Sequence, residues 1–305
     1  MNDVTTEPRD EHGRWTSGSG STKPSDKLWA TLHGDPNGPF VSLADPESNA
    51  AHARAISDIA GSVAKELGFN PSKINITDGE HKFTVNGKDM TAAGLAHRET
   101  GLITLYTKQL TESFTPGATA HEIMHQKWNA YLEDYRAEAA KVMTDPDGAN
   151  SPYRGPDAFM KADGTLGEKY AARYPIYQEY TKLMMNSEKM RAEDGVSDYS
   201  REYWNAVNSG EANRVKGTYI NSQGNVQEYT TSRITLDQCY HETLAEMARL
   251  DYENKKAKEK GSAIFNPVAP PARLKSGKAS TARRSKDWEA LYEAINRNWD
   301  KRSKA

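Results

Sequence analysis

Apolar residues recur every three or four positions in several stretches of the chain, which is the spacing of one buried face of an α-helix. In 236–259, for example, Leu244, Met247 and Tyr252 would share one buried stripe. We also expect a kink at Pro175, because proline removes a backbone donor inside a helix. The pattern predicts helices at 48–67, 118–142, 166–192, 198–208, 236–259 and 286–300.

Between the first two of these helices the apolar and polar residues alternate, which is typical of β-strands. Asn86-Gly87 is a signal for a two-residue hairpin turn, and a polar hairpin is expected at 218–232. The strands are predicted at KINIT (73–77), HKFTV (81–85) and GLITLYT (101–107). A short strand-rich block among long helices predicts the α+β fold class.

The composition describes a polar chain without a membrane span. Of 305 residues, 36% are hydrophobic and 27% charged, and no run approaches the 18 apolar residues that a spanning helix needs. The first 21 residues have no apolar core, so no secretory signal is predicted. Residues 1–27 are rich in Ser, Gly, Thr and charge, and we expect them to be disordered. The single cysteine, Cys239, excludes an internal disulfide framework.

The charge is unevenly distributed. Residues 270–305 carry ten Lys and Arg against four acids, a net charge of +6, so the preceding 269 residues must sum to −8 within the total of −2. The two interpretations are a solvated basic tail and a surface that docks on nucleic acid or an acidic partner.

The sequence HEIMH at 121–125 carries the candidate chemistry. His121 and His125 are four residues apart on a predicted helix, so both imidazoles can point at one metal ion. Glu122 is offset from that face and can reach a metal-activated water instead of the metal. The ion would lower the pKa of the water and polarise a carbonyl, while Glu122 takes the proton as general base. The motif therefore predicts Zn²⁺ and hydrolysis; the alternative is two helix histidines without a metal.

The segment AAGLAHRETGLITLYTKQL, followed by TPGATAHEIMH, resembles the core of the zincin superfamily of metallopeptidases. In that core an edge strand runs beside the active-site helix and holds an extended substrate. The resemblance implies that 101–107 is this edge strand and pairs with the backbone of a protein or peptide substrate. It also implies a small mixed sheet with an active-site helix and a third-ligand helix.

The third ligand separates the zincin subclasses. Metzincins use HExxHxxGxxH, but Trp128 and Tyr131 occupy the Gly and third His positions here. ETLAEMA is similar to the gluzincin helix that follows, as in the catalytic domain of anthrax lethal factor. That resemblance implies Glu242 as the third zinc ligand and Glu246 as the acid that orients a ligating histidine.

Other residues near this helix have weaker assignments. The candidates for the oxyanion-stabilising residue are Tyr229 and Tyr240. His241 diverges by about 100° from Glu242, so it cannot bind the same ion and is expected at the surface or behind a ligand. Cys239 shares a face with Glu242; it is either a thiolate ligand or, more commonly, a small buried side chain.

The spacer between His125 and Glu242 is long for the family, which implies a mainly helical insertion at about 143–235. The expected organisation is a disordered tail (1–27), a metallopeptidase domain (28–259) containing that insertion, and a linker with a basic C-terminal helical tail (260–305).

The leading hypothesis is a zinc-dependent endopeptidase that acts on a protein. The N-terminal stretch RDEHGRWTSGSG resembles short elements of tailed-phage structural proteins, which implies phage proteins as partners and the virion or host cytoplasm as location. Two alternatives stay open: a virion or assembly-associated zincin-fold protein with minor or lost catalysis, and a toxin-like effector protease.

Overall fold

The structure is a computed structural model. Predictions for residues 1–27, for the Asn86-Gly87 turn and for the basic residues of 273–284 lie outside the residues that it describes. The described residues are 37–85, 88–149, 158–185, 197–208, 214–220, 226–233, 235–261 and 286–303.

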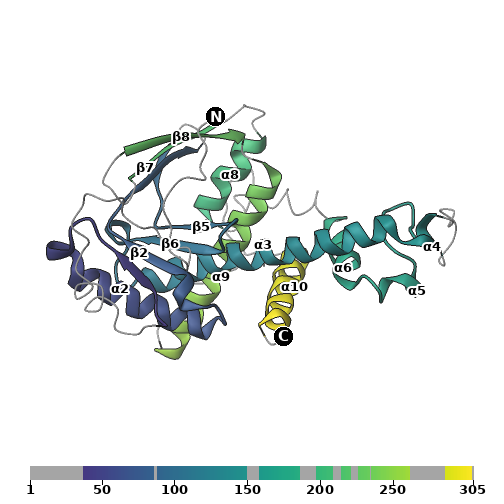
Figure 1. Cartoon of the computed structure of the whole chain (residues 1–305), viewed down its shortest axis with the longest axis horizontal. Helices are drawn as coiled ribbons and strands as arrows, with labels where there is room; N and C mark the ends of the chain where they lie inside the picture. Colours follow the sequence, from purple (N-terminus) through teal and green to yellow (C-terminus); the bar gives the residue numbers. More distant parts are fainter. Residues whose placement is uncertain are drawn as a thin grey trace, which may run out of the picture.

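A four-stranded mixed sheet lies at the centre of the N-terminal half and confirms the α+β fold class (Figure 1). In this sheet β1, β2 and β6 run parallel, and β5 is antiparallel to β6. The order across the sheet is β1 (Phe40–Ser42), β2 (Ile74–Thr77), β6 (Leu102–Tyr106) and β5 (Gly94–His97).

The prediction that 101–107 is the edge strand is wrong. Strand β6 lies between β2 and β5, and the edge is β5, with the sequence GLAH. Alternation in β6 correctly indicates one buried face, because Ile103 and Leu105 are fully buried. Alternation cannot show which strand lies at an edge, and four residues with Gly and Ala give a weak strand signal.

A second, antiparallel sheet has the order β4 (Lys88–Thr91), β3 (His81–Val85), β7 (Arg214–Ile220) and β8 (Val226–Arg233). The β3–β4 register pairs Val85 with Lys88, as a two-residue turn requires, and β7–β8 confirms the predicted polar hairpin. Because β7 pairs with β3, the predicted insertion contributes to this sheet.

The helices agree broadly with the predictions. The main ones are α2 (Pro46–Glu66), α3 (Thr115–Thr144), α6 (Pro175–Met184), α8 (Asp198–Asn208), α9 (Leu236–Glu259) and α10 (Lys286–Arg302); α4 (Pro146–Ala149) and α5 (Glu168–Ala171) are short, as are the 3₁₀ turns η2 (Pro71–Lys73) and η3 (Thr107–Gln109). The predicted kink at Pro175 is wrong, because this residue begins α6 after a break. At a first helical position proline costs no hydrogen bond.

Helix α3 organises the molecule (Figure 1). Its first half packs between the mixed sheet with α2 and the later helix α9, while its second half extends away and carries α4, α5 and α6. One core beside α3 contains the fully buried Trp128, Trp204 and Trp288. The other lies between α2, α3 and the mixed sheet.

The C-terminal helix α10 packs into the first of these cores through Trp288, Leu291 and Ile295. Two of its basic side chains are paired within the chain: Arg297 with Glu179, and Arg302 with Asp134 at 3.3 Å. The domain boundaries of the sequence analysis stay predictions. Among the described residues, no helix is long and apolar enough to cross a membrane.

Candidate metal centre

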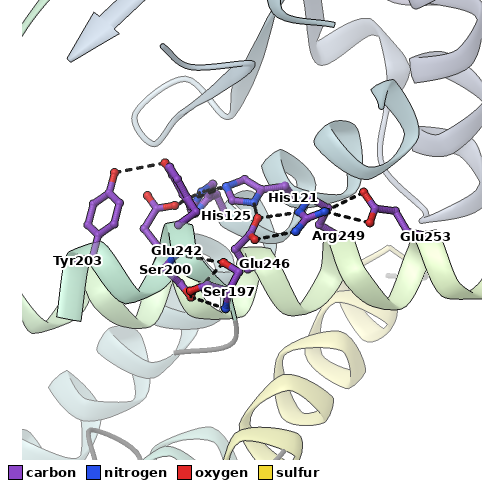
Figure 2. A network of polar contacts seen from close by, with 10 residues as sticks. His121, His125, Ser197, Ser200, Tyr203, Glu242, Glu246, Arg249 and Glu253 are labelled. Atoms are coloured by element: carbon purple, nitrogen blue, oxygen red, sulfur yellow. Dashed lines mark hydrogen bonds and ion pairs between the residues drawn. The ribbon is translucent and has the colours of Figure 1, made fainter. Parts of the chain in front are cut away.

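The two predicted histidines and Glu242 come together where α3 packs against α9. The helices approach closely at Gly117, where a Cβ would overlap the Glu253 side chain and lie 2.9 Å from Cγ of Arg249. His121 and His125 project from one face of α3 toward Glu242 on α9 (Figure 2). These three residues form a group that could hold a metal ion.

The geometry of this group fits a zinc ion. The Nε2 atoms of His121 and His125 are 3.2 Å apart, and Oε2 of Glu242 lies 3.5 and 3.8 Å from them. Tetrahedral bonds of about 2.0–2.1 Å would place ligand atoms about 3.3 Å apart. Oε2 of Glu242 is also buried without a hydrogen-bond partner, which is costly unless another ligand satisfies it. The three atoms are therefore placed as a closed triangle of ligands.

A carboxylate holds the far side of the His121 ring. Oε1 of Glu246 lies 3.0 Å from His121 Nδ1, and Arg249 donates two hydrogen bonds of 2.9 Å to the same carboxylate (Figure 2). Arg249 also donates to Glu253. Burial alone would raise the pKa of Glu246, but the hydrogen bonds with His121 and Arg249 hold it well below its usual range. Glu246 is thus an ionised acceptor that fixes the orientation of His121.

The two histidines have opposite electrostatic environments. Burial lowers the pKa of His125 to about 3, despite the charge of Glu242, so this ring is a neutral lone-pair donor. Burial also opposes the charge of His121, but the neighbouring carboxylates of Glu242 and Glu246 raise its pKa to about 10. A metal ion competes with that proton, so binding at this site would release it.

Glu122 lies beside the triangle but is not part of it. Its side chain packs against Gly94 of the edge strand β5, where a Cβ would be 2.6 Å from Glu122 Cγ. Burial and the charge of Glu242 raise its pKa to about 7, against the opposing charge of His121 and a hydrogen bond from the Ala96 backbone. A carboxylate with a pKa near neutrality is suited to general-base work.

Beside Glu122, the edge strand β5 has backbone peptide groups that point away from β6. Its carbonyls at Ala93 and His97 bond toward β6, accepting from Tyr106 N and Gly101 N. Strand alternation then directs the peptide groups of Gly94 and Ala96 outward, away from β6. Among the described residues, β5 has a ladder only with β6.

Gln126 connects this edge to α3, the helix that carries the two histidines. Its Nε2 donates to the backbone carbonyls of His97 and Leu102, at 3.2 and 2.9 Å. Because Gln126 directly follows His125 on α3, these bonds fix the separation between the histidines and the end of β5.

The sequence analysis missed Tyr199 on α8. Its ring lies 5.9 Å from that of His121, edge to face, and its hydroxyl is 3.3 Å from that of Tyr203. Burial, then the charge of Glu242, raise the pKa of Tyr199 well above its usual value, and Glu122 adds to this. The hydroxyl is therefore neutral, on a ring that packs against His121. The only signal in the sequence is a tyrosine pair four residues apart.

The other candidates lie elsewhere. Tyr240 packs against Trp204 and Trp288 in the helical core, with ring centroids 5.6 and 5.2 Å apart, so the structure does not bring it to the ligands. The side chain of Tyr229 is outside the described residues; its backbone pairs with Gly217. Cys239 is fully buried, and the metal-binding group identified in the described part of the chain does not include it.

Comparison with known proteins found no relative of this chain. No protein-family model matches the chain, and no curated protein or solved structure shows significant similarity to it.

Proposed function

We propose that the protein is a zinc-dependent metallopeptidase of the gluzincin type. The observation that carries the proposal is the triangle of His121, His125 and Glu242, with sides of 3.2 to 3.8 Å and Glu122 buried beside it. A metal site used only for structure has no need of a further carboxylate with a pKa near neutrality.

In this function the three ligands would hold the zinc through Nε2, Nε2 and Oε2. When bound, zinc would lower the pKa of a water molecule and polarise the substrate carbonyl. Glu122 accepts the proton of the attacking water and passes it to the leaving amine. Its burial favours this cycle, because burial makes the carboxylate basic enough to take a proton near pH 7.

A peptide substrate is supported by the free edge of β5. An extended backbone can add to this edge through the peptide group of Gly94 and the carbonyl of Ala96, which requires no particular side chains. The added strand would run past Glu122, since Gly94 packs directly on that side chain. This assigns to β5 the substrate-binding role that the sequence had suggested for 101–107.

The hydroxyl of Tyr199 is the group that we propose as donor to the developing oxyanion. It is neutral, its ring packs against that of His121, and it comes from α8, a different element from the ligands. Such a donor acts where charge appears in the transition state and typically contributes about 10²–10³-fold in rate.

The experiment compares wild type with Glu122→Gln. Both proteins are loaded with Zn²⁺, their metal content is measured, and the peptide bonds cut in a proteome digest are identified. We expect about one zinc per chain in both and a loss of about 10²–10⁴-fold in cleavage for the variant.

Glu133→Gln is the control, because it makes the same change on the same helix at a surface ion pair with Arg302. Its cleavage should equal that of wild type. A wild type that binds no zinc, or a Glu122→Gln variant that cuts as fast as wild type, would refute the proposed function.

A further inference from the structure

The back of the His125 ring is held by a second imidazole, not by a carboxylate. Nδ1 of His125 lies 3.2 Å from Nδ1 of His241, and the two rings are nearly parallel, with an interplanar angle of 26°. His241 comes from α9, immediately before the ligand Glu242. His241 cannot bind the same ion as Glu242, but it contacts the side of the His125 ring that faces away from that ion.

The ligand geometry determines where the protons lie. Nε2 of His125 belongs to the triangle, 3.2 Å from His121 Nε2 and 3.8 Å from Glu242 Oε2, so it must offer a lone pair to a metal. A neutral imidazole has one proton, which then resides on Nδ1 and is donated to His241. His241 must accept this hydrogen bond through Nδ1 and carry its own proton on Nε2.

The far nitrogen of His241 has a partner of the right charge. Its Nε2 lies 3.8 Å from Oδ2 of Asp237, one turn earlier on α9. This distance is longer than a direct hydrogen bond, but it places negative charge on the side where the proton must lie. Trp128 packs edge-on against the His241 ring at 5.9 Å and limits its rotation.

We propose that His241 is a positioning residue of the metal centre, which accepts the Nδ1 proton of His125 and so presents Nε2 of that ligand to the metal. The inference rests on the proposed zinc site and adds a residue and a proton arrangement to it. The chain from metal ligand outward is His125, His241 and Asp237.

This arrangement makes the two histidine ligands unequal. His121 is backed by the ionised Glu246, whereas His125 is backed by a neutral ring. A carboxylate partner increases the basicity of a ligating histidine. The neutral partner on His125 limits the negative charge gathered around one ion, where Glu242, Glu246 and Glu122 already lie close together.

The test measures Zn²⁺ affinity by competition with a chelator in wild type and two variants. His241→Phe keeps an aromatic ring but removes the acceptor, and should weaken zinc binding by about 10–100-fold. His241→Asn places an amide oxygen near the position of Nδ1 and should stay within a few-fold of wild type. Tyr240→Phe, the neighbour that faces the helical core, is the control and should not change the affinity.

Two further measurements separate the loss of the hydrogen-bond acceptor from a loss of packing or of folding. The absorption spectrum of the Co²⁺-loaded protein should change in His241→Phe and be restored in His241→Asn, and thermal unfolding shows whether each variant is folded. Equal zinc affinity in wild type and His241→Phe would overturn the inference alone. An Asn variant as weak as the Phe variant would also overturn it, since packing would then be the cause. A wild type without zinc affinity would overturn the proposed function together with it.

Discussion

The substitution Gly94→Ala should disable the general base while leaving Glu122 itself unchanged. The added Cβ would lie 2.6 Å from Cγ and 2.7 Å from Oε1 of Glu122. Ordinary contacts between carbon atoms are about 3.5–4.0 Å, so the Glu122 side chain must move by about 1 Å. The strand itself tolerates alanine, because Gly94 is not among the glycines with positive φ.

A displacement of about 1 Å in a catalytic group costs about 10²-fold in rate, which corresponds to about 2.7 kcal/mol of activation free energy. We therefore expect kcat/KM for a peptide substrate to fall by about 10²-fold in Gly94→Ala. Zinc content and melting temperature should stay close to those of wild type, since the three atoms nearest to the new methyl group all belong to Glu122.

The control is Gly61→Ala, which makes the same change on α2, where the nearest atom to the new Cβ is the Pro39 side chain at 3.0 Å. It should cleave like wild type. The reasoning is refuted if Gly94→Ala retains full activity. It is also refuted if activity falls only in proportion to lost zinc, because the methyl group would then act on the metal ligands.

Three further results are expected. Glu242→Ala should lose zinc, while Glu246→Ala should bind it about 10–100-fold more weakly; a chelator titration that reverses this order would contradict the ligand assignment. Tyr199→Phe should keep zinc and KM but lose about 10²–10³-fold in kcat, and unchanged kcat would exclude the hydroxyl as oxyanion donor. Glu66 has a pKa lowered from 4.5 to about 2, first by its hydrogen bond with Lys255, so its ionised form stabilises the fold above pH 4.5 and this stability is lost as pH falls toward 2. Glu66→Gln should lower the unfolding free energy at pH 7 by no more than about 1 kcal/mol. In denaturant titrations, the difference in unfolding free energy between wild type and this variant should become smaller as the pH falls from 4.5 to 2.

The paired histidines could be predicted because helix geometry alone places them. A spacing of four residues brings His121 and His125 to one face wherever the helix packs. Their outer partners could not be predicted in the same way. His241 faces His125 only because α9 packs closely on α3, a tertiary contact that spacing within either helix does not indicate.

The edge strand shows a second limit. Alternation in β6 indicates a buried face, and the structure agrees, but the adjacent GLAH carries too few bulky residues to indicate a strand. A glycine at position 94 is unfavourable for a strand in isolation and is required here by the close approach of Glu122. Local propensity therefore pointed away from β5 at the place where the proposed function needs it.

Tyr199 was missed because its role depends on tertiary packing of a distant segment. No spacing rule links α8 to HEIMH, and a tyrosine pair at i, i+4 is common on buried helix faces. Only the packing of α8 on α9 brings its ring against that of His121.

Helix spacing alone does not decide whether Glu242 or Glu246 is the third metal ligand. Four residues on a helix span about 6 Å along its axis and share one face, so spacing cannot rank the two acids. The structure separates them, because Oε2 of Glu242 lies 3.5 Å from Nε2 of His121, whereas Oε1 of Glu246 lies 3.0 Å from Nδ1 of the same ring. The imidazole lies between two acids one turn apart, and only its Nε2 side also faces His125. Arg249 occupies the Glu246 carboxylate with two hydrogen bonds, which leaves Glu242 as the acid able to complete the triangle.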